Sequence, residues 1–129
     1  MIVPPKLGDL RQEVNYQKPT TDRDDYGSPL TEIVNGTRQI IYTDYGSRMA
    51  LVEYVDVDEQ VAADMPQGIS KIIVTHRFLS GLNYADRMWK NGYFDTDAGE
   101  YDRDFYEITG IEWDARRIWH KIHLTALKQ

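Results

Sequence analysis

Acidic side chains gather in one short segment, and their spacing is the first pattern in this sequence that could do chemistry. Asp95 and Asp97 stand where a calcium-binding loop has its first two ligands. Such a loop also needs glycine at its sixth position and glutamate at its twelfth, and this sequence has Glu100 and Tyr106 there. We therefore favour a solvated hairpin tip. The alternative is a small acidic β-barrel enzyme or ligand- or metal-binding domain, with a divalent ion on Asp95, Asp97 and Asp102.

The other residues that could do chemistry do not form a pattern typical of a catalytic centre. The chain has no cysteine, which excludes disulfides, thiolate zinc sites and cysteine nucleophiles. Two of its three histidines, His120 and His123, would point to opposite faces of a strand and could not share one ion from there. No nucleophile elbow, phosphate-binding glycine loop or dinucleotide fingerprint is present. We expect a protein that is not an enzyme and has neither a metal site nor a cofactor.

Length and charge limit the classes of protein that fit. With 129 residues the chain suits one domain, and we assign residues 1–129 to it. A net charge of −6 disfavours nucleic-acid binding by the surface as a whole. No apolar run reaches the length of a membrane span, and the first residues lack a signal-peptide pattern. We expect a protein made in the cytosol, with no membrane partner.

Short segments that alternate between apolar and polar residues predict a mainly β fold. Loops rich in Asp, Gly, Asn and Pro separate them, and Gly46 is expected to separate two strands. We predict a small β-barrel or sandwich of about six strands, with one short helix and long hairpin loops. The expected strands cover residues 10–18, 37–43, 49–55, 71–79, 105–111 and 118–127.

Three segments are expected to differ from this strand pattern. Residues 20–29 contain turn formers and almost nothing to bury, which predicts a long exposed loop. Residues 56–59 have a capping-box layout, which predicts a short helix from Val57 to Met65. Residues 88–104 are acidic and rich in turn residues, including Asn91-Gly92, and we interpret them as an extended hairpin loop.

Charge is distributed unevenly along the chain. Residues 1–114 carry a net charge of −10, whereas residues 115–129 carry +4 from Arg116, Arg117, Lys121 and Lys128. Such an asymmetry favours contact between the basic end of one copy and the acidic loops of another, a head-to-tail arrangement that can close into a ring. An ordinary mixed surface and a nucleic-acid-binding barrel that uses the same cations are the competing interpretations.

Several short motifs follow one another along the chain in a recognisable order. They are Leu10-Arg11 with Val14, Gln17 and Pro19; Asp25-Tyr26-Gly27; Ala50 to Val55; Thr75-His76-Arg77-Phe78; Asp86-Arg87 with Asn91-Gly92; Tyr106 to Ile111; and Arg116-Arg117 through Leu124. In this order they resemble the phage head–tail joining proteins, the small β-barrel head-closure, head-completion or stopper proteins of long-tailed phages and prophages. The resemblance covers about residues 7–127. Residues 93–104 look like an insertion, and residues 40–47 lack the tryptophan often found there.

The resemblance implies structural work in a virion. Copies of such a protein form a homo-oligomeric ring in the neck, between the portal or adaptor protein of the head and the tail-terminator or tail-tube protein. They are assembled in the host cytoplasm, and packaged DNA passes through without sequence-specific binding. Loops at 20–35, 56–70 and 93–104 would reach the channel or a neighbouring ring. Our candidates for subunit or partner contacts are Asp25, Tyr26, Asp95, Asp97, Arg116, Arg117 and Lys121.

Overall fold

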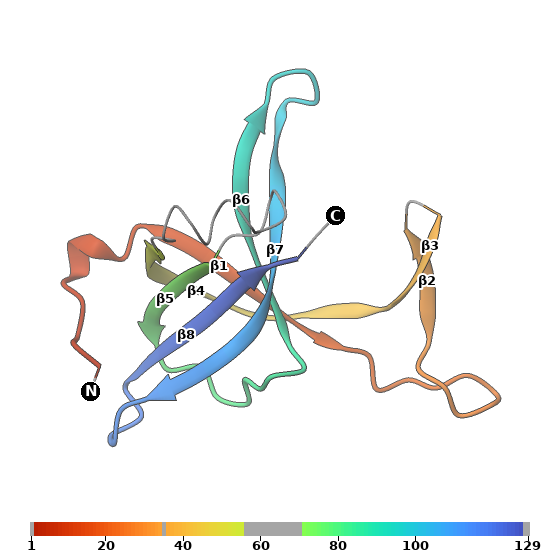
Figure 1. Ribbon diagram of the computed structural model, residues 1–129, viewed down its shortest axis with the longest axis horizontal. Helices are drawn as coiled ribbons and strands as arrows, with labels where there is room; N and C mark the ends of the chain where they lie inside the picture. The colour runs from red at the N-terminus through yellow and green to blue at the C-terminus, as the bar shows by residue number, and fades with distance from the viewer. Residues whose placement is uncertain (1, 35, 56–70, 128–129) are drawn as a thin grey trace, which may run out of the picture.

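Six antiparallel strands close into a barrel in the order β1, β4, β5, β8, β7, β6, while β2 and β3 form a separate two-stranded sheet (Figure 1). The structure is a computed structural model that describes residues 2–34, 36–55 and 71–127. The elements are η1 (Leu7–Asp9), β1 (Gln12–Pro19), β2 (Thr31–Val34), β3 (Thr37–Ile40), β4 (Tyr42–Tyr54), β5 (Lys71–Arg77), β6 (Arg87–Asp95), β7 (Glu100–Trp113) and β8 (Trp119–Ala126). Within these ranges no helix is long and apolar enough to cross a membrane.

Alternate residues of the barrel strands point inward and fill the interior, as the period of two in a pleated strand requires. The prediction of a mainly β fold built as a small barrel is confirmed, and the closed strand order decides between a barrel and a sandwich. The predicted helix from Val57 to Met65 lies outside the described residues. Among the described residues, the largest fully buried side chains are Val14, Tyr16, Ile72, Val74, His76, Met88, Ile122 and Leu124.

The expected break at Gly46 is wrong, because β4 continues through this residue. Gly46 pairs with Tyr16 of β1, next to a register shift between Tyr16 and Gln17. A Cβ atom at Gly46 would lie 3.3 Å from Cδ1 of Leu79, closer than a normal packing contact. The glycine therefore makes room for a core leucine beside a bulged strand. It does not form a turn.

Residues 88–104 form a hairpin, as expected, but the interpretation of this hairpin as an extended loop is wrong. β6 and β7 pair along this segment until a turn at residues 96–99, so that most of it is a two-stranded ladder. The expected turn at Asn91-Gly92 lies inside β6, where the register shifts between Asn91 and Phe94. The chain turns at residues 96–99 instead, and Gly99 has a positive φ of 71° there. Beyond the register shift, the ladder continues with the pairs Phe94–Tyr101 and Asp95–Glu100.

Candidate functional site

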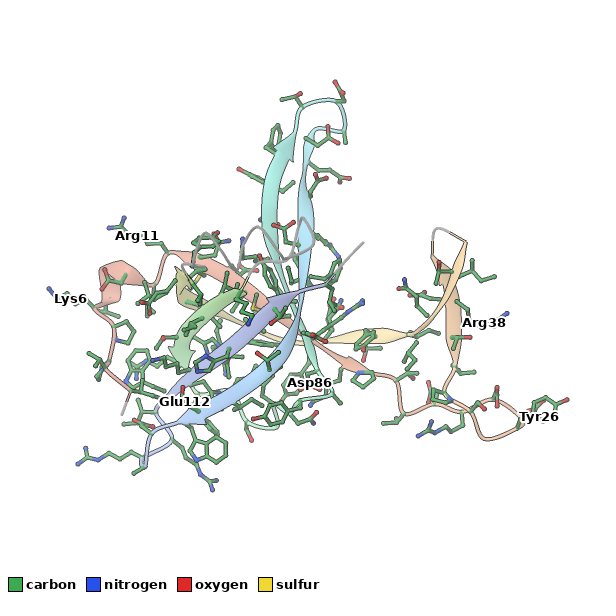
Figure 2. The ribbon with its side chains drawn as sticks, viewed as in Figure 1. Lys6, Arg11, Tyr26, Arg38, Asp86 and Glu112 are labelled. Carbon is green, nitrogen blue, oxygen red and sulfur yellow. The ribbon has the colours of Figure 1, made fainter. Side chains whose placement is uncertain are left out.

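Two hairpins leave the barrel on different sides, and the turn between β7 and β8 lies at a third place, away from both hairpins (Figure 1). The β2–β3 arm is defined here as residues 20–41, and the β6–β7 arm as residues 91–103. The turn between β7 and β8 covers residues 114–118. Six of the seven contact candidates lie at these three places, which are separated around the barrel (Figures 1 and 2).

A loop at the far end of the β2–β3 arm presents Tyr26, which is 94% exposed (Figure 2). The carboxylate of Asp24 accepts hydrogen bonds from the backbone N–H groups of Tyr26 and Ser28, both at 2.9 Å. Gly27 has a φ of 81°, which favours glycine at this point of the loop. Asp25 is exposed beside the tyrosine. The loop is therefore ordered by its own hydrogen bonds while its candidate contact residues face outward.

The sheet of the β2–β3 arm buries little of its own surface. Its strands are four residues long, and Ile33 remains 67% exposed. Arg38 donates a hydrogen bond from Nη1 to Oγ1 of Thr31 at 2.9 Å, and the N–H of Thr20 donates to the carbonyl of Ile41 at 2.8 Å. A two-stranded hairpin with this little apolar burial is marginally stable by itself. Contact with another molecule would therefore stabilise the arm.

The β6–β7 arm is held by a turn and by one aromatic pair. The carboxylate of Asp95 accepts hydrogen bonds from the N–H groups of Asp97, at 2.9 Å, and Ala98, at 3.2 Å. The rings of Phe94 and Tyr101 meet edge to face with their centres 5.0 Å apart. Both side chains remain about half exposed. The arm therefore presents acidic and aromatic groups on a preformed hairpin.

The carboxylates of this arm are not gathered as a cluster of three or more possible metal ligands among the described residues. Across residues 2–34, 36–55 and 71–127, no group of three or more His, Asp or Glu side chains is placed to hold a metal ion. One carboxylate oxygen of Asp95 already accepts hydrogen bonds from the turn.

The prediction that His120 and His123 point to opposite faces of a strand is confirmed. His120 is buried inside the barrel, whereas His123 lies outside, 2.6 Å from a carboxylate oxygen of Glu112. The hydrogen bond from His123 lowers the pKa of Glu112.

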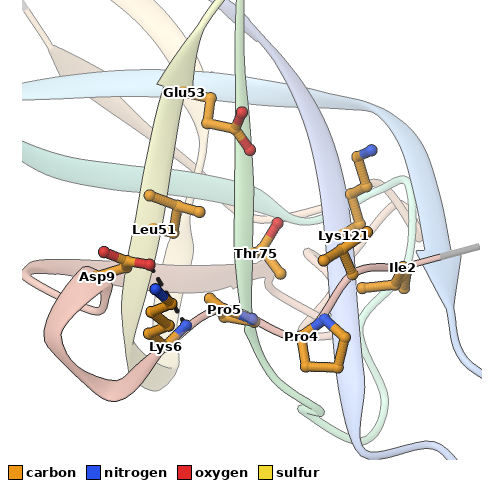
Figure 3. A pocket seen from close by; sticks show the side chains of 10 residues that line it. Ile2, Pro4, Pro5, Lys6, Asp9, Leu51, Glu53, Thr75 and Lys121 are labelled. Carbon is orange, nitrogen blue, oxygen red and sulfur yellow. Dashed lines mark hydrogen bonds between the residues drawn. The ribbon is translucent and has the colours of Figure 1, made fainter.

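The basic residues of the C-terminal hairpin are split between two places. Arg116 and Arg117 are exposed in the β7–β8 turn, where Asp114 accepts a hydrogen bond from the N–H of Ile118 at 2.7 Å. Lys121 instead lies on the outer side of β8, in a hollow beneath the N-terminal segment (Figure 3). The sequence placed the three cations on one edge, but the strand carries Lys121 away from the turn.

The hollow beside Lys121 forms where residues 2–9 cross the outer face of β4, β5 and β8 (Figure 3). Its volume is about 450 Å³. Ile2 is buried against this face, and Thr75 of β5 is 4% exposed beneath it. The N-terminal segment therefore covers one side of the barrel and fixes the surroundings of Lys121.

Asp86 and Arg87 are neighbours in the sequence, and both have partners on β1. Asp86 pairs with Lys18 of β1, at 2.8 Å between Nζ and Oδ2. Arg87 donates from Nε to Oε1 of Gln17 at 2.7 Å, and its guanidinium lies 4.0 Å from the centre of the Tyr42 ring. Burial lowers the pKa of Arg87. These contacts tie β1, β4 and β6 together where the β2–β3 arm leaves the barrel.

A polar pair inside the barrel was missed by the sequence reasoning. Nδ1 of His76 donates to the carbonyl of Arg77 at 2.7 Å, so Nε2 accepts from the hydroxyl of Tyr16 at 2.6 Å. Burial lowers the pKa of His76 to about 4 and raises the pKa of Tyr16, so both are neutral at pH 7. His76 follows Ile72 and Val74 at intervals of two, and this spacing could have placed it in the core.

Comparison with known proteins gives a likeness of fold alone. No protein-family model matches the chain, and no curated protein matches it. Its structure is similar to the solution structure of protein SF1141 from Shigella flexneri 2a, with a TM-score of 0.58 and 19% sequence identity. The likeness covers 95% of this chain and 96% of that protein. The likeness therefore shows that the two proteins share an overall fold.

Proposed function

We propose that this chain is a structural subunit of a tailed-phage or prophage virion, which forms a ring in the neck and joins the head to the tail. The order of the short motifs over residues 7–127 carries the proposal. Most of these motifs lie on strands of one small closed barrel, whereas Asp25-Tyr26-Gly27 lies in the far loop of the β2–β3 arm and Arg116-Arg117 in the β7–β8 turn. A closed barrel has no free strand edges, so its body suits a rigid wall in a ring.

The arms supply the contacts in this proposal. Each is a hairpin whose exposed side chains lie away from the barrel, and each has too little burial to be strongly stable alone. Tyrosine and phenylalanine at such positions are the residue types enriched at the centres of protein interfaces. Docking on a neighbouring subunit, or on a portal, adaptor or tail protein, would cover them.

The charges of the two arms and of the β7–β8 turn favour one orientation of the contacts between subunits. Asp95 and Asp97 are at the tip of the β6–β7 arm, and Asp25 is at the tip of the β2–β3 arm. Arg116 and Arg117 are in the turn at another end of the barrel. Opposite charges on separate ends of one subunit favour head-to-tail contact between copies. The net charge of −6 also lets DNA pass the ring without being bound tightly.

Deletion of the gene from the encoding phage or prophage tests the proposal directly. We expect DNA-filled heads and separate tails in electron micrographs, with infectivity restored by supplying the chain from a plasmid. Normally joined, infectious particles without the chain would contradict the proposal. Heads that never fill with DNA would also contradict it, because they would place the chain in an earlier step.

Charge reversal identifies which surfaces meet. We expect the double variant Arg116→Glu and Arg117→Glu to block joining, because it removes the cations of the β7–β8 turn. Asp97→Lys should restore joining if the β6–β7 arm is the partner surface, and Asp25→Lys should do so if the β2–β3 arm is. Lys6→Glu, an exposed charge reversal on the N-terminal segment, is the matched control.

The purified chain should not form a stable ring by itself, because arms that bury so little offer weak contacts between lone subunits. Analytical ultracentrifugation at micromolar concentration should show mainly monomer. A stable ring under these conditions would contradict this expectation and would show that the subunits need no head or tail protein to associate.

A further inference from the structure

The end of the barrel beside the β6–β7 arm is a polar cavity, which we call the barrel mouth. Its volume is about 430 Å³. Below it the interior is apolar, with Val14 and Met88 fully buried. Barrel mouths of this kind are common places for ligand sites. The residues that line it are Gln12, Tyr54, Lys90, Asn91, Gly92, Asp104 and Tyr106.

Lys90 is an unusual residue for this position, because its side chain is only 7% exposed. It follows Met88 at an interval of two on β6, so the pleat directs it inward. Its ion pair with Asp104 measures 3.9 Å from Nζ to Oδ2, too long for a hydrogen bond. Lys90 lines the cavity, and its ammonium carries three N–H donors that can meet an acceptor there.

The rest of the barrel mouth leaves space for such an acceptor. The rings of Tyr54 and Tyr106 lie 5.8 Å and 5.9 Å from Nζ of Lys90, and Tyr54 is 66% exposed. Asp104 is half exposed at the rim. A Cβ atom at Gly92 would lie 2.7 Å from Oδ2 of Asp104, so glycine at this position allows the carboxylate to stand at the rim.

We propose that the barrel mouth binds one carboxylate group on the ammonium of Lys90, with the carbon skeleton of the ligand against the ring of Tyr54. One cation beside the fixed carboxylate of Asp104 suits a singly charged group. A phosphate carries more charge and meets repulsion from Asp104 and from the acidic β6–β7 arm. The carboxylate could belong to a small organic acid or to an acidic side chain of a protein. This inference does not rest on the proposed virion function.

Amide NMR spectra of the full chain test the site, with benzoate as the free acid and N-acetyl-aspartate amide as the protein-like probe. We expect both to shift the signals of Tyr54, Lys90 and Gly92. Lys90→Met should weaken binding by about tenfold or more, because it removes a charge-assisted hydrogen bond. Tighter binding of benzoate would assign the site to a small acid, and tighter binding of the aspartate probe would assign it to a protein side chain.

A second variant keeps the test decisive if Lys90→Met does not fold. Asp104→Asn removes the carboxylate that competes for Lys90, so we expect it to tighten binding of both probes several-fold. Lys121→Met, which removes a lysine on the outside of β8, should leave binding unchanged. Inorganic phosphate that binds as tightly as the carboxylates, or carboxylate shifts that survive Lys90→Met, would overturn the proposal. The absence of shifts in the folded wild type would overturn it too.

Discussion

The two halves of the β6–β7 hairpin belong to one ladder but have opposite surroundings. In the barrel, Met88 pairs with Tyr106, and both are buried. In the arm, Phe94 pairs with Tyr101, and both are about half exposed. The lower half has further strands on both sides, since β1 pairs with β6 and β8 with β7. Barrel closure therefore decides where the hairpin is buried, and the local ladder and turn alone shape the arm.

The largest expected effect comes from the barrel interior. Ile122→Ala removes a side chain with no exposed surface, and we expect it to lower the free energy of unfolding by about 2–5 kcal/mol. Urea unfolding followed by circular dichroism measures the change. Ile33→Ala, on the exposed β2–β3 arm, should change it by less than about 0.5 kcal/mol. Equal losses in the two variants would break the distinction between barrel and arm.

Acid should also act through the barrel. The pKa of His76 is lowered by burial to about 4, against 6.5 in the unfolded chain. The unfolded chain therefore binds more protons between these two values, and stability falls as the pH drops from about 6.5 to about 4. The other groups facing His76 are Tyr16, His120 and the cation of Arg48, and Arg48 opposes protonation. We expect a loss of about 3 kcal/mol from His76.

Histidine ring NMR signals measured against pH identify the source of this loss. The signal of His76 should stay in its neutral position until close to pH 4. The signal of His123 is the internal comparison, because this histidine lies on the outside of the barrel beside Glu112. A His76 signal that titrates near 6.5 in the folded protein would contradict the prediction.

Replacement of the whole β6–β7 arm should have a smaller effect on stability. Exchanging residues 92–102 for an Asn-Gly turn keeps the pairs from Arg87 to Asn91 with β7 and removes the exposed ladder. We expect the free energy of unfolding to change by less than about 1 kcal/mol, while head–tail joining is lost. Thermal unfolding and particle micrographs measure the two effects. A collapse of stability would show that the arm supports the barrel.

The smallest effect is expected for Phe94→Ala. This change removes one edge-to-face contact from the arm and leaves the barrel intact, so the global free energy of unfolding should stay within about 0.5 kcal/mol. Amide hydrogen exchange should become faster at residues 93–102 only. Faster exchange in β5 or β8 would mean that the arm and the barrel unfold together.

The sequence predicted where strands form better than it predicted which residues pack together in the fold. Alternation along residues 71–79 placed Ile72 and Val74 on one face, and the structure buries both. The same alternation includes His76 and, on β6, Lys90, but polar residue types concealed their inward direction. Gly46 and Asn91-Gly92 were interpreted as turns because glycine permits turns. In the structure, both glycines lie inside strands. Gly46 makes space for the side chain of Leu79, and Gly92 makes space for the side chain of Asp104.

The sequence by itself determined the class of fold, the acidic charge of the chain and the residues able to form exposed turns. These properties depend on composition and on a period of two, which are local. Tertiary structure decided that the strands close into a barrel, that Lys121 lies apart from Arg116 and Arg117, and that Lys90 points into the barrel mouth. These features depend on register and closure between distant strands, which no local pattern encodes.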